Sequence, residues 1–136
     1  MEQVTKAIVR QAGSSKFCNA IEIASHSFVV DEPEFMGGTD LGPAPSGLVA
    51  SELGACTNMM LRMYADMKKL PLDELDTEIT HTPSKDSHHL QRSIKLTGNL
   101  TEEQLQRLLD IANKYPVNKV LISGAAVSSA LSGEAA

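Results

Sequence analysis

The stretch from residue 46 to residue 69 constrains the fold most, because it is long, helical in its spacing and apolar around most of its circumference. Pro45 suits the first turn of a helix, and Pro71 would end one because it biases the preceding residue away from the helical region. A helix that is apolar on most sides is buried on several sides. In a chain of 136 residues, we therefore expect a long buried central helix, covered by a sheet and by a second subunit.

Segments with the alternation typical of antiparallel β-strands flank this helix. Before it come two β-type segments, residues 3–10 and 19–30. A turn at residues 13–15 separates them, and a second turn at residues 26–27 leads into a short third strand. After the helix, residues 75–83 and 90–97 alternate apolar and polar positions on either side of a polar loop. This alternation predicts a second antiparallel pair of strands.

The C-terminal third predicts one more helix and a last strand. Thr101 and Gln104 stand at the spacing of a capping box and open a helix that ends before the next proline. Residues 120–127 are apolar and are predicted to form the final strand, whereas the tail, residues 128–136, is expected to fray. The order is therefore βββ-α-ββ-α-β, an α+β fold with antiparallel sheet in a single domain spanning residues 1–136.

Charge and composition exclude several kinds of partner. The net charge is −5, and no cluster of lysine and arginine offers the basic surface that nucleic acid or an anionic membrane requires. The first residues lack the apolar core of a signal peptide, and no segment approaches the roughly 18 apolar residues of a membrane span. We expect a cytoplasmic protein whose two cysteines are free or redox-active. The histidines lack the spacing of a metal site and the glycine-rich loop lacks the lysine of a phosphate loop, so we expect no metal and no cofactor.

Cys56 lies inside the predicted helix, after a long loop that is rich in glycine and proline. This loop, residues 31–47, contains three prolines and four glycines, and loops of such length inside a compact domain are often functional. The residues alone allow two interpretations of Cys56: a reactive thiol, or a small buried hydrophobe on the Met/Leu face of the helix. The neighbouring methionines (Met59, Met60, Met63 and Met67) likewise suit either an adaptable apolar pocket or ordinary core.

Several short motifs follow one another through the loop and the helix. They are His26-Ser27-Phe28, Asp31-Glu32-Pro33, Gly37-Gly38-x-Asp40-x-Gly42-Pro43-x-Pro45, Leu53-Gly54-Ala55-Cys56-Thr57-x-Met59 and Leu61-Arg62-Met63-Tyr64-Ala65-Asp66-x-Lys68. In this order they resemble the OsmC/Ohr superfamily (osmotically inducible protein C and organic hydroperoxide resistance protein). Weaker similarity at residues 98–103 and 116–117 extends the resemblance over nearly the whole chain. The resemblance implies an intertwined homodimer with active sites at the subunit interface.

The resemblance also implies a cysteine-based peroxidase that reduces organic hydroperoxides. In such enzymes one thiolate attacks the peroxide and becomes a sulfenic acid, a second cysteine condenses with it to a disulfide, and a thiol reductant, lipoylated in some members, restores the pair. Cys56 occupies the position of the attacking cysteine. Three elements of the family's reaction centre differ here: Tyr115 replaces the second cysteine, Ser46 and Gly47 stand where a glutamate is frequent, and the first hairpin offers Lys16 instead of an arginine.

Activation of Cys56 would need a nearby cation, because a free thiol is mostly protonated at neutral pH. The helix dipole offers little help, since Cys56 lies about three turns from the helix start. The candidate cations are Lys16, Arg92 and Arg62. Arg92 has the same parity as the apolar positions of its strand, which predicts that it faces the apolar side of the sheet.

Cys18 and Glu52 have open roles beside Cys56. Cys18 follows Lys16 in the first hairpin, so it either takes over the role of the missing second cysteine or is an ordinary strand cysteine. Glu52 precedes Cys56 by one helical turn. Its carboxylate has three alternatives: pairing with a cation at the interface, hydrogen bonding at the site, or exposure to solvent.

Two functions remain open from the sequence. In the first, Cys56 reduces an apolar hydroperoxide, Lys16 or Arg92 supplies the charge, and Cys18 or an external thiol resolves the sulfenic acid. In the second, the protein is a non-catalytic homodimer of the same fold that binds a small apolar ligand or a partner, and Cys56 is core packing.

Overall fold

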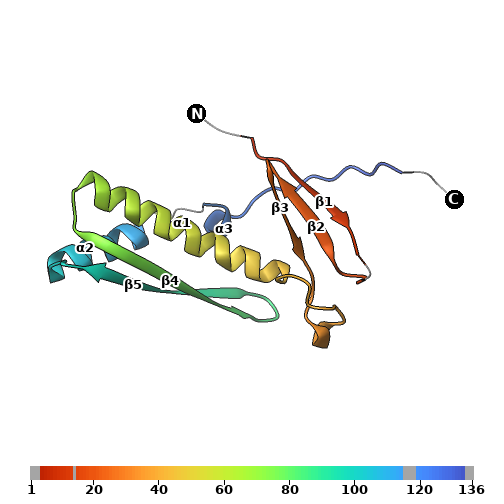
Figure 1. Ribbon diagram of the computed structural model, residues 1–136, viewed down its shortest axis with the longest axis horizontal. Helices are drawn as coiled ribbons and strands as arrows, with labels where there is room; N and C mark the ends of the chain where they lie inside the picture. The colour runs from red at the N-terminus through yellow and green to blue at the C-terminus, as the bar shows by residue number, and fades with distance from the viewer. Residues whose placement is uncertain (1–3, 14, 115–118, 134–136) are drawn as a thin grey trace. The chain divides into compact units, whose positions relative to one another are not determined.

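The computed structural model describes residues 4–13, 15–114 and 119–133. It divides the chain into two compact units: Met1–Glu52 with Ile79–Arg92, called unit 1 here, and Leu53–Glu78 with Ser93–Ala136, called unit 2. The elements follow the order β1, β2, β3, a short 3₁₀ helix (Glu34–Met36), α1, β4, β5, α2 and α3 (Figure 1). The expected α+β class with antiparallel strands is confirmed.

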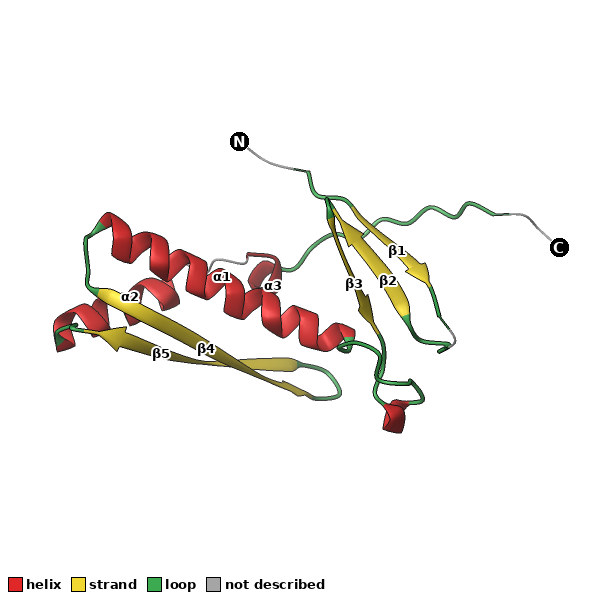
Figure 2. Ribbon diagram, viewed as in Figure 1, coloured by secondary structure: helices red, strands yellow, loops and turns green. Residues whose placement is uncertain are grey.

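Unit 1 contains a three-stranded antiparallel sheet. Its strands β1 (Ala7–Gln11), β2 (Asn19–Ile23) and β3 (His26–Val30) lie in sequence order (Figure 2). Ile21 in the central strand pairs with Val9 on one side and with Phe28 on the other. The predicted hairpin is confirmed. The second tight turn exists, but it lies at residues 24–25, whereas His26 and Ser27, where it was predicted, already belong to β3. Ala24 takes a positive φ of 54° in that second turn.

Helix α1 (Pro45–Met67) confirms the predicted long helix and begins at the expected proline. One chain alone buries a single face of it, at Gly54, Thr57, Leu61 and Ala65. The methionines Met59, Met63 and Met67 are 66%, 72% and 68% exposed. Burial therefore follows a narrower stripe than the sequence indicates, because the neighbouring elements of unit 2 cover only one side. In the described ranges, neither α1 nor any other helix is long and apolar enough to cross a membrane.

Strands β4 (Leu72–Pro83) and β5 (His88–Gly98) pair with each other, which confirms the second predicted hairpin. Alternate side chains along both strands are half-buried while their neighbours are exposed. Ser84 closes the turn between the strands, because its amide and its hydroxyl both donate to the carbonyl of Ser87 at 2.8 and 2.9 Å.

Helix α2 (Glu102–Lys114) starts at the predicted capping box. The amide of Thr101 donates to Oε1 of Gln104 at 3.0 Å, and the amide of Gln104 donates to Oγ1 of Thr101 at 3.1 Å. Two residues of its apolar face, Leu108 and Ala112, pack with Leu61 of α1 as the core of unit 2. Half-buried side chains of the hairpin, among them Leu75, Ile94 and Leu96, complete this core.

The predicted final strand over residues 120–127 is wrong. Residues Lys119–Ser123 form a short helix, α3, and residues 124–133 have no regular structure. The amide of Gly124 donates to the carbonyl of Val120 at 2.9 Å, and Gly124 takes a φ of 78°, the left-handed conformation that ends helices. Strand propensity depends on partners, and within the described residues this segment pairs with no strand.

Leu108→Ala should lower the free energy of unfolding by about 2–5 kcal/mol, because it opens a cavity beneath a fully buried side chain. Leu109→Ala is the matched control. Leu109 is the next residue on the same helix and is 44% exposed, so its truncation should lower the free energy of unfolding by less than about 1 kcal/mol. Urea unfolding followed by circular dichroism measures both variants. Equal losses would contradict this assignment of the core.

Candidate functional site

An open groove of about 790 Å³ runs along the second half of α1, and Cys56 is one of the residues that line it. Its walls come from α1, from Lys68 directly after it, and from Ile111 and Arg107 of α2, all within unit 2. Most of the lining is apolar. The groove therefore exists within one compact unit and brings a thiol together with an apolar surface.

Cys56 is a free, half-buried thiol. Its neighbour Thr57 is fully buried and donates to the carbonyl of Leu53 at 2.7 Å, which satisfies its hydroxyl inside the helix. Cys56 thus lies at the edge of the buried stripe of α1, with its side chain on the groove. This position fits a thiol that a ligand of the groove could reach.

The methionines of α1 form most of the apolar wall. Met59, Met60, Met63 and Met67 all line the groove, and Met60 also packs against the core of unit 2. The sequence allowed either an apolar pocket or ordinary core for these side chains. In the structure three of the four are more exposed than buried, so they form a groove wall and not core. Flexible thioether side chains adapt to apolar ligands of varied shape.

Two cations stand at the end of the groove away from Cys56. Lys68 follows Cys56 by twelve residues, which corresponds to about 18 Å along a helix axis. Arg107 of α2 reaches the same end, where its Nε donates to the hydroxyl of Tyr64 at 3.0 Å. Sequence reasoning missed both cations. Helical spacing places Lys68 one turn after Tyr64, but no local signal brings Arg107 of α2 to the same place.

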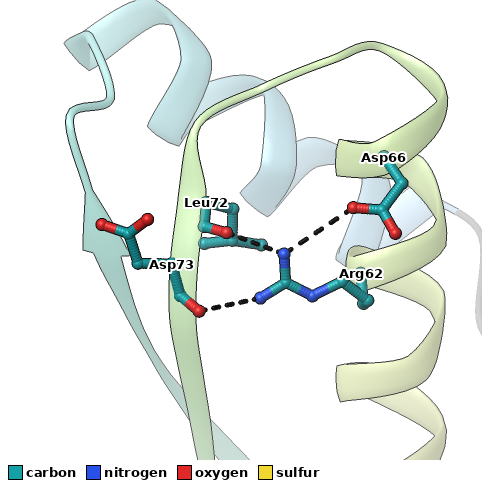
Figure 3. A network of polar contacts seen from close by, with 4 residues as sticks. All are labelled: Arg62, Asp66, Leu72 and Asp73. Carbon is teal, nitrogen blue, oxygen red and sulfur yellow. Dashed lines mark hydrogen bonds and ion pairs between the residues drawn. The ribbon is translucent and has the colours of Figure 1, made fainter.

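Arg62, one of the cations considered for Cys56, is engaged elsewhere. Its guanidinium donates to the carbonyls of Leu72 and Asp73 at 2.7 and 3.1 Å and forms an ion pair with Asp66 at 3.7 Å (Figure 3). These bonds tie the end of α1 to the start of β4. Arg62 therefore holds the frame of unit 2 and does not line the groove.

Lys16 and Cys18 both lie in the turn between β1 and β2, in unit 1. Lys16 is exposed and its Nζ lies 5.0 Å from the ring centroid of Phe17, a cation–π contact. Cys18 is free and only 4% exposed. The structure thus brings these two predicted site residues together in one turn, where the cation is accessible and the thiol is covered.

Arg92 and Glu52 also belong to unit 1. Arg92 is half-buried on β5 like Ile94 and Leu96, which confirms its predicted parity. Partial burial lowers the pKa of the Arg92 guanidinium. Glu52 is exposed on α1, which matches the solvent alternative for its carboxylate. The remaining predicted position, Tyr115, lies outside the described residues.

Asp31 organises the long loop that precedes α1, and sequence reasoning missed this role. It is 1% exposed, and its carboxylate accepts five hydrogen bonds. Burial by itself raises the pKa of Asp31, but hydrogen bonds from Glu32, Leu41, Thr39 and Ser15 outweigh it and hold the pKa below its ordinary value. An aspartate at the first position of a loop rich in glycine and proline was the available signal.

These hydrogen bonds join two separate segments of unit 1. The hydroxyl of Ser15, next to Lys16, donates to Oδ1 of Asp31 at 3.1 Å. The loop folds closely around the same carboxylate, and a Cβ at Gly38 would collide with the carbonyl oxygen of Glu32. Asp31 therefore sets the position of the Lys16 turn against the loop.

A second polar contact joins His81 of β4 and His88 of β5. Their Nε2 and Nδ1 atoms lie 2.9 Å apart, which corresponds to one hydrogen bond across the hairpin. Within the described ranges, no three histidine, cysteine or carboxylate side chains gather as the ligands of a metal ion.

Comparison with known proteins gives one family and a common fold. The family model for OsmC-like protein matches residues 38–129, more than half of the chain. An OsmC-like protein from Mycoplasma pneumoniae superimposes with a TM-score of 0.71 and 16% identity, covering 91% of this chain and 90% of that one. An organic hydroperoxide resistance protein from Legionella pneumophila gives 0.63 and 19%, covering 84% and 85%.

A third structure, an organic hydroperoxide resistance protein from Elizabethkingia anophelis with bound thiocyanate, gives a TM-score of 0.64 and 18% identity. The alignment covers 85% of each chain. At such identities the likeness of the three structures shows the fold alone. The comparison with curated protein sequences gives no match.

Asp31→Asn should flatten the loss of stability on acidification. Because the folded-state pKa is lowered, the contribution of Asp31 is fully present above its ordinary pKa of 3.8 and is lost as the pH falls through 3.8 towards the folded pKa. Urea unfolding at about pH 5 and about pH 3 should therefore show a steeper fall for the unmodified protein than for the variant. Asp40→Asn, in the exposed part of the same loop, should keep the steep fall. Identical curves for all three proteins would refute the role of Asp31.

Proposed function

Because the chain belongs to the OsmC-like protein family, we propose that it is a cysteine-based peroxidase that reduces organic hydroperoxides through Cys56 in the cytoplasm. One observation carries this proposal: Cys56 is a free, half-buried thiol on the wall of an apolar groove. An apolar wall holds the organic part of a hydroperoxide beside the sulfur. Relatives of the same fold named as organic hydroperoxide resistance proteins support this substrate class.

The proposed reaction uses a hydroperoxide and thiols only. The thiolate of Cys56 attacks the terminal oxygen of the hydroperoxide, the O–O bond breaks, and the alkoxide leaves as an alcohol after it gains a proton. The sulfur is now a sulfenic acid. A second thiol condenses with it to a disulfide and releases water, and a further thiol restores Cys56 by disulfide exchange.

The second thiol is Cys18 or an external reductant in this proposal. Tyr115 stands where the family has its second cysteine, so the reaction needs another source of sulfur. Cys18 is 4% exposed and would have to become accessible before it reacts. This burial favours the external thiol.

A positive charge near the sulfur would stabilise the thiolate. In this proposal Lys16 or Arg92 supplies the charge, and Glu52 pairs with that cation at the subunit interface. The exposed ammonium of Lys16 supports Lys16 as this cation. Arg62 is a poorer candidate because its guanidinium is bound to the backbone of β4. Lys16→Met should then slow the reaction more than Lys85→Met, which removes an exposed lysine from the β4–β5 turn.

The groove also supports a second function, non-catalytic binding of a small apolar ligand or a partner. Its methionine wall offers apolar surface whether or not Cys56 reacts. The tyrosine at the position of the second cysteine favours this alternative, because a binding protein has no need of a resolving thiol. In that case Cys56→Ser would change stability and leave ligand binding intact.

We propose in addition that the protein forms a homodimer. The apolar side of α1 that one chain leaves uncovered supports an interface between copies, since Met59, Met63 and Met67 are 66%, 72% and 68% exposed. Sedimentation velocity should give twice the 14.6 kDa mass of one chain. A stable monomer at micromolar concentration would remove the dimer from the account.

Reaction of the reduced protein with one equivalent of cumene hydroperoxide should oxidise Cys56. Intact mass spectrometry should show the gain of one oxygen atom, or the loss of two hydrogens if Cys18 condenses with the sulfenic acid. Addition of a small dithiol should restore the original mass, because sulfenic acids and disulfides are reducible.

Cys56→Ser and Cys18→Ser separate the two products. Cys56→Ser should show neither change, whereas Cys18→Ser should still gain the oxygen atom. An unchanged mass in the unmodified protein, or the same oxidation in Cys56→Ser, would refute the proposed peroxidase.

A further inference from the structure

We propose that His81 and His88 form a two-histidine site for a transition-metal cation, Zn²⁺, Ni²⁺ or Cu²⁺, at the turn end of the β4–β5 hairpin. Both side chains belong to unit 1, whereas the groove that contains Cys56 is lined by residues of unit 2. The inference concerns metal binding and does not depend on whether Cys56 reacts.

The two rings lie on the same side of the hairpin although they come from different strands. His81 has the parity of the half-buried Ile79 on β4, and His88 has the parity of the half-buried Leu90 on β5. Counted from the turn at Ser84 and Ser87, the two histidines are diagonal neighbours across the strands. Long and aromatic side chains at such positions are within reach of each other.

The distance between the two rings suits a shared cation. Nε2 of His81 and Nδ1 of His88 lie 2.9 Å apart. Zinc–imidazole bonds are about 2.0–2.1 Å long, so two nitrogens bound to one cation at about 90–110° are about 2.9–3.4 Å apart. The two nitrogens therefore already have the separation of neighbouring ligands. Rotation of the rings about their side-chain bonds, without movement of the strands, can direct both at a cation.

The protons of the two rings allow this change. A neutral imidazole has one N–H and one lone pair, so one of the two facing nitrogens donates the present hydrogen bond and the other accepts it. When the donating ring takes its other tautomer, its proton lies on the nitrogen away from the partner ring. Both facing nitrogens then offer a lone pair, and two neutral rings bind the cation without a net loss of protons.

The hairpin orders the pair before a cation arrives. The two rings are stacked, with centroids 5.1 Å apart and planes at 28°. The turn beside them is closed by the amide of Ser84, which donates to the carbonyl of Ser87 at 2.8 Å, and by the two serine hydroxyls, which lie 2.7 Å apart. Ligands that are already in place lose less conformational entropy on binding.

The type and number of ligands define the class of cation and of site. Imidazole nitrogen suits zinc, nickel and copper, whereas magnesium and calcium prefer oxygen ligands. Among the described residues no third histidine, cysteine or carboxylate joins the pair. Two protein ligands leave the remaining coordination positions to water. Because structural zinc sites have four protein ligands, this is an open site at which a further ligand can replace water.

The site was not predicted from the sequence because its two ligands come from different strands. His88 and His89 are adjacent in the chain, but neighbouring residues of a strand point to opposite faces of the sheet. The partner of His88 is instead His81, seven residues earlier on β4. His89 is therefore a natural control for the proposed site.

A zinc titration of the full chain, followed by proton–carbon NMR of the histidine rings, tests the proposal. The Cys56→Ser variant is used so that the thiol of the groove does not compete for the cation. On addition of Zn²⁺, the ring signals of His81 and His88 should shift together, while those of His26 and His89 should stay in place. Mg²⁺ at the same concentration should shift none of them.

Matched variants in the same Cys56→Ser background measure the contribution of each ring by isothermal titration calorimetry. His81→Asn and His88→Asn should each weaken Zn²⁺ binding at least about tenfold, since even the loss of a residue that only orients a metal ligand costs about 10–100-fold. His89→Asn removes an exposed ring from the next position along β5 and should leave the affinity unchanged.

Two results would overturn the proposal. Equal losses of affinity in His81→Asn and His89→Asn would mean that Zn²⁺ is attracted to exposed imidazoles without a defined site. Shifts of the His26 or His89 signals as large as those of His81 would lead to the same conclusion. Neither readout depends on the reduction of a peroxide, so failure of the proposed peroxidase and failure of this inference remain distinguishable.

Discussion

Helix α1 carries apolar side chains on more of its circumference than its neighbours cover. The core of unit 2 is built on the covered face, and the groove lies on the uncovered one. Leu61 and Ala65 are completely buried on one face, where Leu61 packs with Leu108 of α2. The methionines of the opposite side stay on the surface. Because covering a side chain of this size contributes about 1.5–3 kcal/mol, such a wall favours an occupant. The helix thus builds a core with one face and a binding surface with the other.

Arg62 shows how this arrangement is held at the end of α1. Its two hydrogen bonds reach backbone carbonyls of β4, so they depend on the position of the strand and not on its side chains. The ion pair with Asp66 is exposed and spans one helical turn, and contacts of this kind contribute little. The guanidinium therefore acts chiefly as a clamp between helix and hairpin.

In unit 1 the equivalent constraint is the buried carboxylate of Asp31. A carboxylate removed from water must find donors, and the loop supplies backbone amides and a threonine hydroxyl while the β1–β2 turn supplies Ser15. This requirement explains why a loop rich in glycine and proline has a defined course. It also links the turn that carries Lys16 to the segment leading into α1.

The elements that could be predicted from the sequence are those whose signal is local. Spacing of apolar residues located α1, alternation located β4 and β5, and the reciprocal bonds of Thr101 and Gln104 confirmed the capping box. The strand predicted over residues 120–127 is wrong because β-branched residues such as Val120 and Ile122 favour strands only where a partner strand exists. Their short helix is decided by the surrounding structure, which no local pattern records.

The candidate site was only partly predictable for the same reason. Cys56 and its methionines lie on one element, so helical spacing was enough to group them. Lys68 and Arg107 come from two segments that packing brings together, and Asp31 bonds to residues up to sixteen positions away. The spacing of residues within one helix or strand cannot predict contacts between separate segments. The roles of Lys16, Arg92, Cys18 and Glu52 remain predictions.

Site-resolved alkylation of the folded protein tests the central claim most directly, since that claim makes Cys56 the accessible thiol of an apolar groove. N-ethylmaleimide would be added in excess, and peptide mass spectrometry would follow the labelling of Cys56 and Cys18 with time. The account predicts fast labelling of Cys56 in the folded protein, and labelling of Cys18 only after unfolding in urea. Labelling of Cys56 only in urea, or equal rates at both cysteines in the folded protein, would contradict it.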